Sequence, residues 1–245
     1  MRAALSQVAI LVAGVVAYEL ARLVLSPDWP VALANAHRVA SWERDTHLAW
    51  EAPLQRWLVA RPPLVDAANV FYLGANFLGT TVFFVWLYRR SRVGFRRFRD
   101  GFLLATAVAL LVAWRFPLAP PRLAGLGLED TLRRFSGIDI GSPGSGGLTD
   151  PVAAMPSLHA GWAAGVAAGL VLYGRRPIVR ALAPLYPLAA VVTILATGNH
   201  FAVDALAGVA LVLASLGLTA LASGGTVVRW HLRRGVEQPG SSPGS

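Results

Sequence analysis

The sequence predicts an all-α polytopic membrane protein in which six transmembrane helices form one bundle. Hydrophobic residues make up 55% of the 245 residues and charged residues only 14%, whereas an ordinary soluble domain is about one quarter charged. Apolar runs of about 18 residues or more, long enough to cross a hydrocarbon core of about 30 Å as a helix, recur along the chain. The expected spans cover residues 3–25, 65–88, 101–118, 157–173, 178–197 and 200–222. The first run is longer than a signal-peptide core, so we expect a retained helix.

The distribution of basic residues predicts how these spans are oriented. All 22 basic residues are arginines, and the formal net charge is +9. Clusters of them occupy residues 88–100, residues 174–180 and the segment after the last span. Cytoplasmic loops are enriched in Arg and Lys, so we expect a multi-pass protein of the cell membrane with both termini in the cytoplasm. The charge is therefore mainly a topology signal, with anionic lipid headgroups as a secondary contact, and we expect no nucleic-acid partner.

This orientation places residues 26–64, residues 119–156 and the turn near residue 198 on the extracytoplasmic side. Residues 29–63 contain four tryptophans and scattered charges, which favours interfacial helices because indole rings prefer the membrane–water interface. Residues 119–156 form a loop too long for a simple connection, and such loops are usually functional. Its Gly/Ser stretch, residues 141–147, is expected to be flexible. The polar tail, residues 223–245, is expected to be disordered in the cytoplasm.

Two residue types are missing, and their absence excludes several reaction classes. The chain has no cysteine, which excludes disulfides, Cys-ligated zinc, iron–sulfur clusters and thiol nucleophiles. Because it also has no lysine, it contains no Walker A loop, Schiff-base lysine or Ser-Lys dyad. The GxSxG pattern occurs only in the polar tail, at residues 240–244, where we expect no nucleophile elbow, and this argues against the common serine hydrolases. We expect no cofactor.

Ionisable residues inside an apolar span indicate function, because a charged side chain there costs about 2.5 to 3.5 kcal/mol. In AAMPSLHAGWAAG, residues 153–165, Pro156 and Ser157 predict the start of a helix, with Ser157 as its capping residue. His159 then lies in the first turn. The unpaired N–H groups and the dipole of a helix N-terminus favour an anion beside Ser157 and His159.

A second group of polar residues lies in TGNHFAVDALAG, residues 197–208. His200 and Asp204 are four residues apart, which places them in contact on one face of a helix. An aspartate in that position accepts a hydrogen bond from one imidazole nitrogen and raises the basicity of the other, as a nucleophilic histidine requires. In RFPLAPPR, residues 115–122, Arg115 and Arg122 supply two guanidinium forks that fit a phosphate.

The predicted topology brings these residues to the extracytoplasmic ends of the third, fourth and sixth spans, which favours a catalytic role over a packing role for both histidines. Two other interpretations stay open. His159, His200 and Asp204 are ligands that suit zinc or iron, although the paired arginines would repel a cation, and we expect no metal. A lipid transporter or flippase that uses His200 and Asp204 as a proton relay is the third hypothesis.

The three polar motifs, in this order, resemble those of the type 2 phosphatidic acid phosphatase (PAP2) superfamily, which read KxxxxxxRP, PSGH and SRxxxxxHxxxD. The resemblance covers about residues 29–210. Arg115 occupies the Lys position of the first motif, and Arg122 matches its Arg. Ser157 and His159 belong to PSLH, which matches the second motif with Leu for Gly. His200 and Asp204 match the third, whereas the positions that correspond to its Ser-Arg pair, and to the Pro of the first motif, hold Thr193, Ile194 and Leu123.

The residues of FPLAPPR, AMPSLH and TGNHFAVD are similar to the motifs of the branch that contains inositol phosphorylceramide synthases, in which the third motif also lacks the Arg. The resemblance implies a single transmembrane domain, residues 1–222, that acts on an amphiphilic lipid carrying a phosphate. It implies a metal-independent phosphatase or a phosphotransferase that passes the phosphoryl group to an alcohol acceptor. His200 would attack phosphorus and form a phosphohistidine-type intermediate, Asp204 would orient it, and His159 would protonate the leaving oxygen.

The same resemblance implies that the substrate phosphate is bound by Arg115, Arg122 and Ser157. Preorganised positive charge at the non-bridging oxygens is the main source of catalysis in phosphoryl transfer. Asn76 falls in the second expected span at a position where relatives in this branch carry a histidine, so we expect it to make a supporting contact or none.

Overall fold

The computed structural model describes residues 28–139 and 152–222, together with part of residues 6–20. Regular structure in these residues is helical, apart from one isolated bridge between Leu118 and Ala153. The elements are α2 (Trp29–Asp45), α3 (Glu51–Val59), α4 (Pro62–Val70), a π-helical turn (Phe71–Ala75), α5 (Asn76–Arg90), α6 (Arg92–Arg115), a 3-10 turn (Pro121–Leu123), α7 (Thr131–Ser136), α8 (Leu158–Tyr173), α9 (Pro177–Leu182), α10 (Leu185–Ala196) and α11 (Ala202–Ala222). The predicted all-α class is confirmed for this part of the chain.

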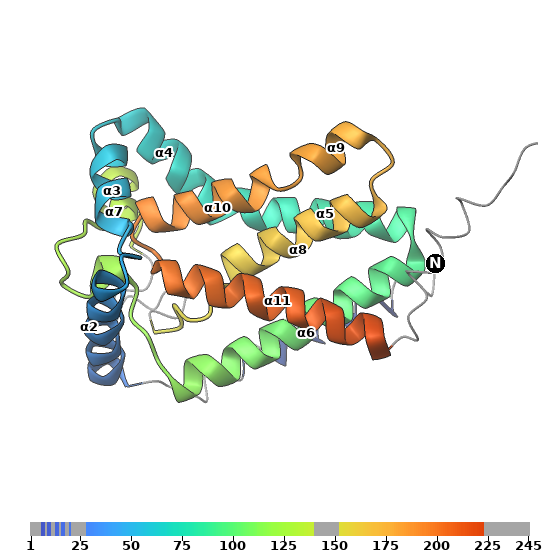
Figure 1. The fold of residues 1–245 in the computed structure, drawn as a ribbon, viewed down its shortest axis with the longest axis horizontal. Helices are drawn as coiled ribbons and strands as arrows, with labels where there is room; N and C mark the ends of the chain where they lie inside the picture. Colours follow the sequence, from blue (N-terminus) through green and yellow to red (C-terminus); the bar gives the residue numbers. More distant parts are fainter. Residues whose placement is uncertain are drawn as a thin grey trace, which may run out of the picture.

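The long helices α5, α6, α8, α10 and α11 run along the long axis of the molecule, and α2, α3 and α7 lie together at one end of it (Figure 1). Helix α11 packs against α8 and α6, and α10 packs against α8 and α3. The connections from α5 to α6 and from α8 to α9 lie at the opposite end (Figure 1). The bundle therefore has one end covered by short helices and another that carries arginine-rich turns.

Glycines on α8 allow the central helices to approach closely. A Cβ atom on Gly161 would lie 2.6 Å from the carbonyl oxygen of Gly208 in α11, and one on Gly165 would lie 2.6 Å from the ring of Phe102 in α6. Small residues at such contacts are typical of helix packing in membranes, where van der Waals contact and not water exclusion stabilises the bundle.

Helices that meet the requirements of a membrane span occur in the described residues. Residues 177–196 and helix α11 are long and apolar enough to cross a membrane, and the pair formed by α4 and α5, bent by 47°, is a third candidate. Helix α8 has only 16 residues, and α6 carries several arginines and Asp100 in its first half. A membrane location is thus indicated, whereas six spans and their orientation stay predictions. Most of the first expected span, residues 3–25, lies outside the described residues.

Several predicted boundaries differ from the structure. Helix α6 begins at Arg92 and not at residue 101, because the Ser91 side chain caps it by accepting a hydrogen bond from the Gly94 amide at 3.0 Å. The span expected at residues 178–197 corresponds to the candidate span at residues 177–196, within which a turn at Ala183 and Pro184 separates α9 from α10.

The segments predicted on the extracytoplasmic side are more regular than expected. Residues 29–63 contain α2, α3 and the start of α4, whereas the position of these helices at the membrane interface stays a prediction. The expected loop, residues 119–156, contains a 3-10 turn and helix α7. The Gly/Ser stretch at residues 141–147 and the tail at residues 223–245 lie outside the described residues.

Candidate active site

His159 and His200 face each other at the end of the bundle that α2, α3 and α7 cover. Their ring centroids are 5.9 Å apart, with an angle of 53° between the ring planes. His159 is the second residue of α8 and lies two positions after the capping residue Ser157, whose side chain accepts a hydrogen bond from the amide of Ala160 at 3.4 Å. The helix start predicted from Pro156 and Ser157 is therefore confirmed.

The hydrogen bonds of His200 define its tautomer. Its Nδ1 lies 2.9 Å from the carbonyl oxygen of Ala154, and because a carbonyl only accepts, Nδ1 must carry the proton. Nε2 therefore keeps its lone pair, as a nucleophile requires. Asp204 Oδ2 lies 3.5 Å from the same Nδ1 and accepts a hydrogen bond from the Phe201 amide at 2.9 Å. The spacing of four residues does bring His200 and Asp204 together, but His200 precedes α11, and the carbonyl is the nearer partner.

A short parallel bridge places the Ala154 carbonyl beside His200. The Leu118 amide donates to the carbonyl of Val152 at 2.7 Å, and the Ala154 amide donates to the carbonyl of Leu118 at 3.1 Å. The neighbouring Ala119 amide bonds to Ala32 of α2 at 3.2 Å. The segment that precedes α8 is thus fixed against the segment that follows α6.

His159 lies among aromatic side chains. The ring of Tyr72 stacks on it at a centroid distance of 4.5 Å, and Phe77 meets it edge-on at 5.8 Å. Asn76 donates a hydrogen bond to the backbone carbonyl of His159 at 3.2 Å and accepts one from the Tyr186 hydroxyl at 2.8 Å. Asn76 therefore supports the main chain of His159 and makes no hydrogen bond to its imidazole. Tyr72 has no counterpart in the sequence prediction.

Arg122 is buried and joined to the turn that carries His200. Its backbone amide donates to the Gly198 carbonyl at 2.9 Å, and its Nε donates to Asn199 Oδ1 at 2.9 Å. Gly198 has a φ of +68°, and a Cβ atom there would lie 3.2 Å from the Arg122 Cβ. A positive φ and so close an approach both require glycine. The first and third motifs are thereby linked directly.

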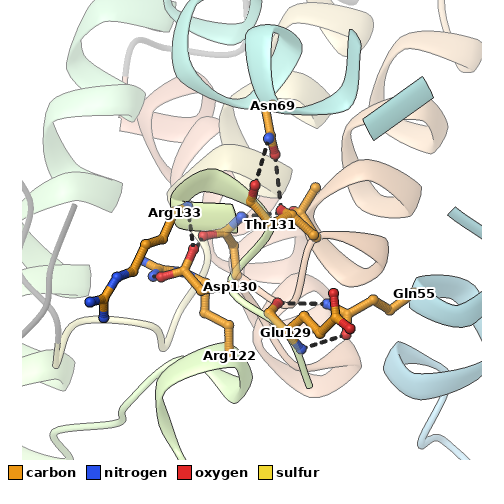
Figure 2. A network of polar contacts seen from close by, with 9 residues as sticks. Gln55, Asn69, Arg122, Glu129, Asp130, Thr131 and Arg133 are labelled. Atoms are coloured by element: carbon orange, nitrogen blue, oxygen red, sulfur yellow. Dashed lines mark hydrogen bonds and ion pairs between the residues drawn. The ribbon is translucent and has the colours of Figure 1, made fainter. Parts of the chain in front are cut away.

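The Arg122 guanidinium also forms an ion pair with Asp130, Nη1 to Oδ2, at 2.5 Å. Helices α3 and α4 hold the segment that carries Asp130 (Figure 2). Gln55 exchanges two hydrogen bonds with the backbone of Glu129, at 2.9 and 2.7 Å. Asn69 donates to the Thr131 carbonyl at 3.0 Å and accepts from the Thr131 hydroxyl at 2.9 Å. The position of Arg122 consequently depends on two helices that precede it in the chain.

The second and third motifs are joined through the main chain, because the amide of Ser157 donates to the carbonyl of Asp204 at 3.0 Å. Ser157 and Asp204 are both completely buried. Arg115 differs from the other predicted site residues. It is exposed at the last residue of α6, and the hydrogen bonds and ion pairs of the described residues do not join it to His159, His200 or Arg122.

Two glutamates that the sequence prediction overlooked bind the first turn of α11. The amide of Ala202 donates to Glu51 Oε1 and that of Val203 to Glu43 Oε1, both at 2.7 Å. A signal for Glu43 was present in the sequence, since it continues the helical spacing of the apolar positions 32, 36, 39 and 40. A charged residue on the apolar face of an amphipathic helix indicates a buried partner. Glu51 lies on the buried face of α3 with Gln55 and Leu58.

The described side chains are not arranged as the candidate metal site requires. Among residues 28–139 and 152–222, no three or more His, Asp or Glu side chains are arranged to hold a metal ion. His159 and His200 instead make aromatic and hydrogen-bonding contacts.

Fold and site together define a class: an all-α membrane protein with two facing histidines and a buried arginine at one end of its bundle. Residues 37–218 match the PAP2 superfamily, and because this match covers most of the chain, the protein belongs to that superfamily. Membership points to a phosphoesterase of the lipid phosphate phosphatase type, in a family whose phosphatases are typically metal-independent, and to a phosphate-bearing substrate. No curated protein and no solved structure matches the chain.

Proposed function

We propose that this protein is a lipid-phosphate phosphoesterase that works through a phosphohistidine intermediate at the extracytoplasmic face of the cell membrane. The observation that carries the proposal is the pair of facing histidines, in which a carbonyl holds the proton of His200 on Nδ1 and leaves the Nε2 lone pair for attack. The arginine-rich turns lie at the opposite end of the bundle from this pair (Figure 1). By the positive-inside rule, this supports an extracytoplasmic site.

The roles of the residues follow from their positions. Nε2 of His200 attacks phosphorus, the bond from phosphorus to the lipid oxygen breaks, and protonated His159 gives that oxygen its proton. The resulting phosphoimidazolium is positively charged and is stabilised by Asp204, which is completely buried. Water then attacks phosphorus and gives its proton to His159, the P–N bond breaks, and His200 is restored. Two displacements replace one difficult step.

Binding of the phosphate falls to Arg122 and the start of α8. The Arg122 guanidinium is permanently charged and is held by Asn199 and Asp130 before any ligand arrives, and such preorganised charge is effective in phosphoryl transfer. Ser157 and the first N–H groups of α8 provide further donors for the same oxygens. Arg115, which is exposed, serves the phosphate of an incoming lipid from outside the buried group.

The test is turnover of a lipid-phosphate panel, diacylglycerol and polyprenyl phosphates, by detergent-purified protein without added metal. Wild-type protein should release phosphate. When the phosphate group of the substrate is radiolabelled and the reaction is stopped without acid, His200 should carry the label. His200→Ala should lose both signals. Unchanged turnover in that variant would eliminate the proposal.

A phosphotransferase that resembles inositol phosphorylceramide synthase is the second candidate, and one observation favours it. Ile194, at the position of the family's second phosphate-binding Arg, is buried in an apolar cluster with Ala160 and Leu195, so that part of the site offers no charge to the phosphate or to an attacking water. An alcohol would then discharge the intermediate. Mass spectrometry of products with and without an acceptor alcohol distinguishes the two, because full-rate discharge by water alone excludes the transferase.

A further inference from the structure

Two glutamates from the segment before the first described span cap the helix that follows His200. Glu43 of α2 accepts a hydrogen bond from the Val203 amide, and Glu51 of α3 accepts one from the Ala202 amide. Both side chains are buried, Glu43 completely. These amides are among the first N–H groups of α11, which have no partner within the helix. The backbone on which His200 and Asp204 lie is thereby tied to α2 and α3.

Three carboxyl groups meet at this helix start. The pKa of Glu43 is raised to about 8, mainly by burial and also by the neighbouring charges of Glu51 and Asp204, against the lowering effect of the Val203 amide. Burial also raises the pKa of Glu51. Glu43 Oε2 has no hydrogen-bond partner among the described residues, so no donor there stabilises a negative charge on it. A protonated carboxyl beside an ionised one donates a hydrogen bond to it.

We propose that Glu43 and Glu51 share one proton and act as positioning residues for His200 and Asp204, with Glu43 as the donating acid and Glu51 as the accepting carboxylate. The positioning role rests on the function proposed above. With one proton the pair carries a single negative charge, which suits the positive end of a helix dipole. The two oxygens that do not share the proton, Oε1 of each glutamate, can then accept the hydrogen bonds from the amides of α11.

Loss of the shared proton would place two adjacent carboxylates beside Asp204. The titratable groups that face Glu43 are Glu51 of α3 and Asp204 of α11, with His200 against the latter. Repulsion among the three carboxylates would weaken the cap and move the turn that carries His200. A displacement of about 1 Å at a reacting group costs about 100-fold in rate, so we expect turnover to fall as the pH rises through the titration of Glu43.

The experiment compares Glu43→Gln with Glu43→Ala in the full-length protein. Glutamine reproduces the protonated acid, because its amide donates to Glu51 and its oxygen accepts the Val203 amide. We expect Glu43→Ala to lower kcat about tenfold or more at pH 7, Glu43→Gln to restore most of it, and the decline of turnover near pH 8 to be absent from the glutamine variant. Equal kcat in the two variants, or an unchanged alkaline decline in Glu43→Gln, would overturn the positioning role.

An infrared measurement tests the shared proton without turnover. Wild-type protein at pH 7 should show the carbonyl band of a protonated carboxyl group, and Glu43→Gln should lack it. Glu129→Gln is the matched control, because the Glu129 side chain is 41% exposed and pairs with Arg134, and it should keep the band. A band that persists in Glu43→Gln would contradict the shared proton. Full activity of His200→Ala would instead eliminate the proposed function and leave the band unaffected, so the two failures are distinguishable.

Discussion

Gly208 of α11 lies against the main chain of Ser157: a Cβ atom added to it would be 2.0 Å from the Ser157 carbonyl oxygen. The Ser157 amide bonds to Asp204, one helical turn earlier in α11. The absence of a side chain at Gly208 is therefore what allows the start of α8, with His159, to reach the segment that carries His200.

Gly208→Ala should separate α8 from α11. The added methyl group meets backbone atoms, which cannot rotate away. We expect the overpacking to cost about 1 to 3 kcal/mol of stability and so to lower the unfolding temperature. Because the clash lies between the segments that carry His159 and His200, we also expect turnover to fall by more than tenfold. Gly217→Ala on the same helix is the control, because a Cβ there meets nothing within 4 Å. It should be neutral or slightly stabilising, since alanine is the better helix former. Equal thermal stability of the two variants would contradict this account of the contact.

His159→Ala should lower kcat/KM more for substrates with a poor leaving group than for substrates with a good one. If His159 protonates the leaving oxygen, its removal should lower kcat/KM for a lipid phosphate by about 10²- to 10⁴-fold. A nitrophenyl phosphate needs no such proton and should be affected much less. Loss of His200 should affect both substrates equally. The same factor for both substrates in His159→Ala would refute the role as acid.

Arg122→Ala should reduce both stability and activity. Its removal leaves the buried Asn199 Oδ1 without its donor and breaks the ion pair with Asp130, which costs about 1 to 3 kcal/mol. The loss of a preorganised charge should lower kcat/KM by at least about 100-fold. Arg122→Lys keeps the positive charge but lacks the paired N–H donors of a guanidinium, so it should recover only part of the rate.

Arg115→Ala provides the comparison for Arg122. Because Arg115 is exposed, its removal should change the free energy of unfolding by no more than about 0.5 kcal/mol, and its effect on kcat/KM should be the smaller of the two. Denaturation followed by tryptophan fluorescence measures stability, and a phosphate-release assay measures activity. A greater loss of stability in Arg115→Ala than in Arg122→Ala would contradict the burial of the latter.

Stability of the wild-type protein should decrease with pH through the titration of Glu43. The pKa of Glu43 is raised to about 8 from an ordinary value of 4.5, so between these values the folded state binds more protons than the unfolded state. The free energy of unfolding therefore falls as the pH rises over this window. Glu43→Gln removes this titration, and its unfolding temperature should depend less on pH between 5 and 8. Parallel curves for the two proteins would show that Glu43 does not titrate there.

Much of the fold was predictable because the signals for it are local. A run of apolar residues predicts a buried or membrane-embedded helix wherever its partners lie, and Ser157 caps α8 as predicted because capping involves only the next few residues. The contact between His200 and Asp204 was also predicted, although His200 precedes α11 and does not lie on a face of that helix. The start of α6 at Arg92 was not predicted, because arginines precede its apolar run and the capping role of Ser91 was not recognised.

The arrangement of the site required contacts that no local pattern contains. The sequence by itself determined the all-α class, the apolar character of the chain and the residue types available for phosphoryl transfer. Only the tertiary structure decided that Ala154 holds the His200 proton, that Arg122 and not Arg115 is buried beside the turn, and that Glu43 caps α11. Each of these bonds joins segments far apart in the chain. Periodicity shows which face of a helix is buried, whereas the complementary shapes of packed helices determine which buried faces meet.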